Sequence, residues 1–154
     1  MAVKILIPFN FTENDEKSID FVGQRYGKRT ELEITLFHAY TPVPDLETPG
    51  NHIMKPVIRN TYYLQHQQDE KKNALEAARQ RLVNHGIAEQ KIQCLFRPVR
   101  QNVAQDIIRL YKDGNHDVVV LSRNPGNIVN FFSRSISKQI ARHVQGGIGM
   151  HIVN

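Results

Sequence analysis

The chain has 154 residues, of which 40% are hydrophobic and 23% are charged. These proportions are typical of globular proteins, and they exclude a disordered, collagen-like or fibrous chain. The 20 lysines and arginines exceed the 15 aspartates and glutamates by five, which is too small an excess to indicate a nucleic-acid-binding protein by itself. The length predicts one domain, residues 1–154, with a single hydrophobic core.

The first forty residues predict a strand, a helix and a second strand. Val3–Pro8 is nearly continuous in apolar residues, which is typical of a strand that helices cover on both faces. Apolar residues from Ile19 to Tyr26 recur at helical spacing, and Gly27 ends this predicted helix. The second predicted strand is Leu32–Ala39.

A long loop and a long helix follow. Thr41–Lys55 contains three prolines and a glycine, which predicts a loop of unusual length, and such loops are often functional. The second helix is predicted over about residues 59–85, with Gly86 closing it.

The second half of the chain continues the alternation. The predicted elements are a strand at Lys91–Phe96, a helix from Val103 to Leu110, a strand at Asp117–Leu121, a helix that carries Ile136 and Ile140 and starts near Ser133 or Ser135, and a final strand at Ile148–Val153. Strands that alternate with helices indicate βαβ units, so we predict an α/β fold with a five-stranded, mainly parallel sheet and about four helices.

The single cysteine and the short apolar runs indicate a cellular compartment. Cys94 excludes an internal disulfide, and its apolar neighbours favour a small core residue over a reactive thiol. The N-terminal apolar run is far shorter than the core of a signal peptide, and no run approaches the about 20 apolar residues that span a bilayer. We therefore expect a cytoplasmic protein without a membrane segment.

The segment after the fourth predicted strand carries the most informative chemistry. Ligands of open α/β sheets bind beyond the carboxyl ends of the strands, and the following helix start offers free N–H groups and a partial positive charge. Residues that could add hydroxyl donors or charge there are Arg123, Ser133, Arg134, Ser135 and Ser137. The pattern fits a phosphate or nucleotide site, and it also fits an ordinary strand–loop–helix connection with serine caps.

Other constellations are weaker. Arg134, Lys138 and Arg142 share one helical face, which is either a solvated surface or a phosphate-contacting stripe. The histidines have no metal-binding spacing, and His38 alone ends a predicted strand near the possible site. Asp15 and its acidic neighbours lie in a helix first turn, where the dipole favours them, and we do not interpret them as a catalytic pair.

Four segments in order resemble the universal stress protein family. Lys4–Thr12 is similar to the family's first strand and turn, usually V-P-x-D-x-S, and Leu36–Tyr40 is similar to its second strand. Asp117–Ser122 resembles its fourth strand, and Arg134–Ile140 resembles the G-S-V-S/T start of its last helix. The resemblance implies a flavodoxin-like three-layer α/β/α sandwich and a homodimer that pairs through the C-terminal strand, Ile148 to Val153.

The resemblance also implies where a nucleotide would bind. The matching positions, taken as the candidate nucleotide or anion site, are Pro8, Asn10, Ala39, Leu121, Ser122, Arg123, Gly126, Arg134, Ser135, Ile136 and Ser137. Members that bind ATP share the pattern G-x2-G-x9-G-S/T. Here Ser122 and Arg134 occupy the first and third glycine positions, and the second falls on Asn124 or Pro125. Asn10 replaces an acidic residue.

These departures change the expected chemistry. Glycine permits close backbone approach, whereas proline removes an N–H donor and arginine places a long side chain at the helix start. We therefore expect a non-catalytic stress-response or signalling module with a protein partner, no metal and no firmly assigned cofactor, which does not bind ATP in the usual family mode. The alternative is a member that binds ATP or AMP, or hydrolyses ATP weakly, through a variant loop. A nucleic-acid partner is not expected, because no RNA- or DNA-binding motif accompanies the charge.

Overall fold

The structure is a computed structural model that describes residues 2–11, 13–42, 55–122, 138–142 and 149–153. Its five strands form one parallel sheet in the order β3-β2-β1-β4-β5. Their bounds are β1 (Val3–Pro8), β2 (Leu32–Tyr40), β3 (Ile92–Pro98), β4 (Val118–Ser122) and β5 (Gly149–Val153). All five predicted strands and the parallel α/β class are confirmed.

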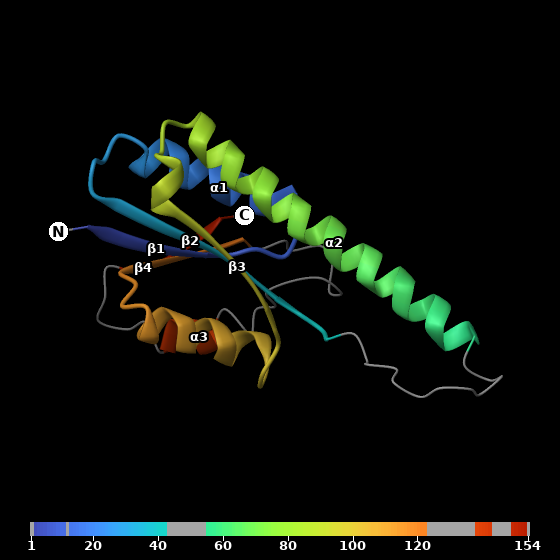
Figure 1. Cartoon of the computed structure of the whole chain (residues 1–154). Coiled ribbons are helices and arrows are strands. Elements are labelled where there is room, and N and C mark those ends of the chain that lie inside the picture. Colours follow the sequence, from blue (N-terminus) through green and yellow to red (C-terminus); the bar gives the residue numbers. More distant parts are fainter. Residues whose placement is uncertain (1, 12, 43–54, 123–137, 143–148, 154) are drawn as a thin grey trace.

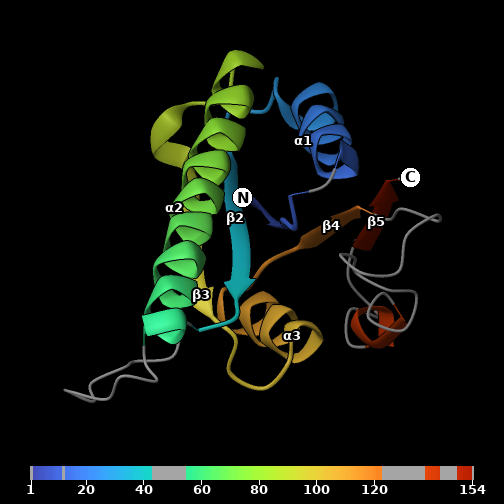
Figure 2. The ribbon, with the colours of Figure 1, turned by 90° about the vertical axis from the view of Figure 1, so that its right-hand side faces the viewer.

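The helices cover both faces of the sheet. Three of them are α1 (Glu13–Tyr26), α2 (Lys55–Asn84) and α3 (Val103–Asp113), a 3₁₀ turn spans Glu89–Lys91, and residues 138–142 are also helical. In Figure 1, α1 and α2 lie on one face and α3 on the other, while the first half of α2 extends beyond the sheet. Figure 2 shows the same sandwich along a perpendicular view, with β5 at one side of the sheet.

Most predicted boundaries shift by one to a few residues, and the two clearest differences are at α2 and β3. α2 starts at Lys55, so the predicted loop loses its last residue and the helix begins earlier than residue 59. β3 runs on to Pro98, because parallel pairing with β2 continues as far as Tyr40 opposite Pro98. The remaining loop residues 43–54 and the predicted helix start at Ser133 or Ser135 lie outside the described residues.

The core consists of two apolar layers, one on each face of the sheet. Alternate residues of β1 illustrate the division, since Ile5 and Ile7 face α1 and α2, whereas Leu6 faces α3. Ile140 joins the α3 layer, so the predicted apolar face of the last helix is confirmed at that residue. Burial of side chains of this size contributes roughly 1.5–3 kcal/mol each to folding.

A polar cluster fastens α1 to α2. The Asp20 carboxylate accepts two hydrogen bonds from the Arg81 guanidinium, at 2.8 and 2.7 Å, and lies 3.0 Å from His85 Nε2. A methyl group added at Gly23 would overlap the His85 ring, so glycine permits this close packing. Gly86, with φ at +97°, then ends α2 in the left-handed conformation that glycine adopts without cost.

Candidate functional site

The strand order places a topological switch point at the carboxyl ends of β1 and β4. β1 lies between β2 and β4. The chain continues from β1 to β2 and β3 on one side of β1, and then crosses back to β4 and β5 on the other side. In open α/β sheets this is where ligands bind. The residues that follow the two strands, Phe9 and Asn10 after β1 and Ser122 at the end of β4, therefore border the candidate site.

A buried carboxylate connects the two strand ends. Asp15, in the first turn of α1, is 0% exposed, and Ser122 is 3% exposed. Ser122 Oγ donates a hydrogen bond to Asp15 Oδ1, and the Asn10 backbone N–H donates to Asp15 Oδ2 at 2.9 Å. Both carboxylate oxygens thus bind protein groups, and Asp15 holds the β1 turn against the end of β4.

The role of Asp15 in joining the two strand ends was not predictable from the sequence. A helix first turn explains an acidic residue without any tertiary contact, and Ser122 lies 107 positions away in the chain. The only signals in the sequence were an acidic residue at a predicted helix start and a serine at a predicted strand end, and neither indicates that the two residues are in contact.

An aromatic cluster adjoins Asn10 on the side of β2. His38 is 6% exposed, and its Nδ1 lies 2.8 Å from the Phe9 carbonyl oxygen, to which it donates. The Phe11 ring packs edge-on against His38, and the Phe96 ring stacks on both His38 and Tyr40. Burial lowers the pKa of His38, so the imidazole is neutral near pH 7 and keeps its proton on Nδ1.

Phe11 has an unusual backbone conformation. Its φ is +61°, in the left-handed region that bulky residues seldom adopt. The edge-on contacts with the rings of Phe9 and His38, at 5.1 and 4.6 Å between centroids, hold the side chain in the cluster. The turn after β1 is therefore fixed by aromatic packing as well as by Asp15.

Three of the predicted site residues line one small pocket. Its described lining is Pro8, Phe9, Asn10, Phe37, His38, Ala39, Val103 and Ile107. These residues leave a volume of about 20 Å³, which is close to the space that one water molecule needs. Pro8, Asn10 and Ala39 thus meet at one edge of the sheet, but they enclose much less space than a nucleoside fills.

The other predicted site residues fall into two groups. Leu121 is fully buried in the apolar layer beneath α3, and Ser122 is committed to Asp15. The remaining ones lie outside the described residues: Arg123, Gly126, Arg134, Ser135, Ile136 and Ser137. Of the predicted basic stripe, Lys138 and Arg142 are exposed.

A larger hollow of about 380 Å³ lies between α1 and α2. Its walls are apolar except for Glu16 and Arg81, and its lining also includes Phe9, Phe11, Ile19, Ala74, Ala77 and Ala78. Arg81 is engaged by Asp20 and by Glu16, 3.4 Å away, so this hollow offers a ligand little free charge.

Other chemistry is limited within the described part of the chain. Among those residues, no group of three or more histidine, cysteine or acidic side chains could hold a metal ion. Cys94 is half-buried against the core, which fits the predicted small core residue, and burial raises the pKa of its thiol to about 11. No helix in the described ranges is both long and apolar enough to cross a membrane.

Comparisons with known proteins identify the fold. No family model and no curated protein matches the sequence. Among solved structures, a universal stress protein from Archaeoglobus fulgidus is 12% identical, with a TM-score of 0.66 over 100% of this chain and 95% of the other. A universal stress protein family member from Burkholderia pseudomallei is 15% identical, with a TM-score of 0.64 over 97% and 94%.

A third neighbour was solved with a nucleotide. It is a universal stress protein family protein from Arabidopsis thaliana with AMP bound, 13% identical, with a TM-score of 0.60 over 99% of this chain and 92% of the other. Further neighbours are universal stress proteins in complex with cAMP and with dAMP. The sheet order and helix layers define a flavodoxin-like α/β/α sandwich. Within that class, the chain has the universal stress protein fold, as its motifs predicted.

Proposed function

We propose that this chain is a non-catalytic module of the universal stress protein type, acting in a cytoplasmic stress response or signalling pathway, which does not bind ATP in the usual family mode. The observation that carries the proposal is the closed hydrogen-bond network of Asp15, Ser122 and the Asn10 backbone. Where a glycine would let a phosphate approach the backbone, Ser122 presents a side chain that already has a protein partner.

The same network argues against catalysis. A serine beside a carboxylate suggests a nucleophile and a base, but both side chains are almost completely buried. A substrate cannot reach the Ser122 hydroxyl without displacing the turn that Asp15 holds. The small pocket at Pro8, Asn10 and Ala39 likewise leaves no room for a nucleoside in this conformation.

Isothermal titration with ATP tests this proposal. We expect no saturable binding up to about 1 mM nucleotide, because Ser122 stands where the ATP-binding members have a glycine and its hydroxyl already donates to Asp15. Micromolar or tighter affinity for ATP would overturn it. Nucleotide that remains with the protein through purification, detected by its absorbance after denaturation, would overturn it as well.

A second candidate function is binding of a nucleoside monophosphate, in a conformation in which the small pocket at Pro8, Asn10 and Ala39 is open. One observation favours it. Neighbours of the same fold were solved with AMP, cAMP or dAMP. Titration of labelled protein with AMP and cAMP should then shift the amide signals of Asn10 and Ala39, and the absence of such shifts at millimolar nucleotide would exclude this candidate.

We also propose a homodimer that forms through β5. Within the described part of the chain, β5 pairs with β4 alone, so its outer edge has free backbone groups. Ile152 on β5 is 40% exposed. Light scattering should give twice the 17.7 kDa of one chain. Ile152→Glu should give a monomer, whereas Leu64→Glu, at an equally exposed leucine of α2, should leave the dimer intact; a monomeric wild type would refute this assembly.

A further inference from the structure

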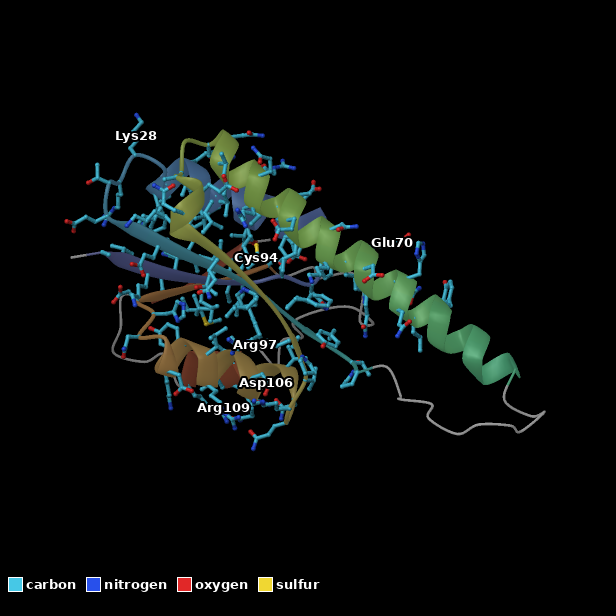
Figure 3. The ribbon with its side chains drawn as sticks, in the orientation of Figure 1. Lys28, Glu70, Cys94, Arg97, Asp106 and Arg109 are labelled. Carbon is cyan, nitrogen blue, oxygen red and sulfur yellow. The ribbon has the colours of Figure 1, made fainter. Side chains whose placement is uncertain are left out.

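Three arginines surround a pocket that lies between β3 and α3. The pocket has a volume of about 340 Å³ and is bordered by Arg97, Arg100 and Arg109. Figure 3 shows Arg97 between β3 and α3, and Arg109 on α3, on the face of the sheet opposite α1 and α2. It is distinct from the small pocket at the switch point, and among the described lining residues the two share only Phe37.

The three guanidinium groups are not neutralised by nearby acids. In the described ranges, none of these side chains has a hydrogen bond or an ion pair with another residue. The arginines of α2 behave differently, since Arg79 pairs with acidic side chains and Arg81 with Asp20. Three charged donors at one pocket therefore remain available to a ligand.

Asp106 borders the same pocket but serves the backbone. It is 9% exposed, and its carboxylate accepts hydrogen bonds from the backbone N–H groups of Arg100, at 2.9 Å, and Gln101, at 3.4 Å. Asn102 then caps α3 by accepting from the Gln105 N–H at 2.9 Å. These bonds fix the turn between β3 and α3, so Arg100 is held at the pocket before any ligand arrives.

α3 places charged side chains beside the apolar base of the pocket. Asp106, Arg109, Leu110 and Asp113 recur at helical spacing, so they lie along one side of the helix. Phe37, 5% exposed, and Leu110 form an apolar base that Pro98 extends. Asp113, at the end of α3, is the second acidic residue of the described lining after Asp106. The described lining therefore carries three positive and two negative side chains.

We propose that this pocket binds a small organic anion, whose phosphate or carboxylate group contacts the three guanidinium groups while an apolar ring covers Phe37, Leu110 and Pro98. Guanidinium groups bind both oxyanions through paired, charge-assisted hydrogen bonds. The volume falls in the range of small-molecule sites, which combine apolar walls with a few convergent polar groups. The proposal does not depend on whether the switch point binds a nucleotide.

Amide shift mapping with four simple probes tests the site. Phenyl phosphate and benzoate combine the ring with each oxyanion, while inorganic phosphate and phenol carry one half each. We expect saturable shifts of Arg97, Arg100, Gln101, Arg109 and Leu110 with phenyl phosphate, benzoate or both, and weaker binding of inorganic phosphate and phenol. The compound that binds more tightly identifies the oxyanion.

A charge-matched pair of variants separates the site from net charge. Arg97→Gln/Arg109→Gln should weaken binding at least about tenfold, since charge-assisted hydrogen bonds are lost. Lys28→Gln/Lys72→Gln removes two positive charges from exposed positions elsewhere and should leave the affinity unchanged. All four side chains are exposed, and circular dichroism verifies that both variants fold.

Four results would overturn the proposal. These are no saturable shift up to about 10 mM of either ring compound, shifts confined to Asn10, Ala39 and Ser122, equal weakening in both variants, and inorganic phosphate or phenol binding as tightly as the better ring compound. Shifts at the α3 pocket that disappear only in Arg97→Gln/Arg109→Gln would establish it.

Discussion

The buried carboxylate of Asp15 supports a prediction about stability. Asp15→Ala removes the acceptor of the Ser122 hydroxyl and of the Asn10 N–H, which are part of a buried network. Leaving a buried donor without a partner costs about 1–3 kcal/mol, so the two donors together cost about 2–6 kcal/mol, and the lost interaction of the carboxylate with the helix dipole adds a few tenths. We expect the variant to lose about 3–4 kcal/mol of its free energy of unfolding.

Urea unfolding measures this loss. With a slope near 2 kcal/mol per molar, the midpoint should fall by about 1.5–2 M. Glu16→Ala is the matched control, because Glu16 lies in the same first turn but is exposed, and its loss should stay below about 1 kcal/mol. Asp15→Asn should fall between the two, since an amide can accept from Asn10 and donate to Ser122 Oγ.

A double-mutant cycle separates the network from a general effect of helix disruption. Ser122→Ala removes the donor and leaves a buried carboxylate oxygen with one bond fewer. Once Asp15 is alanine, Ser122→Ala should cost much less, so the two losses should differ from additivity by at least about 1 kcal/mol. Additive losses, or a loss in Asp15→Ala no larger than in Glu16→Ala, would refute the network.

Three further predictions concern titratable groups. Burial lowers the pKa of His38, so below about pH 6.5 the unfolded chain binds a proton at this residue more readily than the folded chain does. The free energy of unfolding should therefore fall from pH 6.5 to 5, and it should fall less steeply in His38→Gln. Urea unfolding at several pH values checks this expectation. Because the pKa of the Cys94 thiol is about 11, iodoacetamide at pH 8 should alkylate Cys94 about 100 times more slowly in the native chain than in urea. Mass spectrometry measures both rates, and similar rates would contradict this prediction. The hydrogen bonds from Arg81 lower the pKa of Asp20, so an NMR titration should show this pKa rising in Arg81→Gln, and an unchanged value would show that Arg81 is not the cause.

The strands were predictable because their signal is local. Residues 118–121 of β4 are all apolar, which is typical of a strand that helices cover on both faces. The meeting of Pro8, Asn10 and Ala39 was predictable for a related reason, since parallel strands end at the same edge of a sheet. The longer β3 was not, because pairing with β2 rather than its own composition carries it to Pro98.

The contacts that decide the chemistry of both sites were not predictable. Asp15 reaches Ser122 only because β4 lies beside β1, and strand order is a tertiary property. Arg97 and Arg109 lie on different elements with no motif to connect them. Their association depends on how α3 packs beside the end of β3, which neither helical nor strand periodicity specifies.

The two sites differ in how their charges are satisfied, and this difference bears on where an anion binds. At the switch point, a phosphate would approach a buried carboxylate, and like charges repel strongly where water is excluded. Asp15 gains its hydrogen bonds from Ser122 and Asn10, so an anion there would compete for the donors that stabilise the carboxylate. Beside α3, the acid Asp106 is saturated by backbone N–H groups, and the guanidinium groups face the pocket without partners among the described residues. An anion placed at α3 therefore gains hydrogen bonds without taking any from the protein, whereas one placed at the switch point must first break the network that closes it.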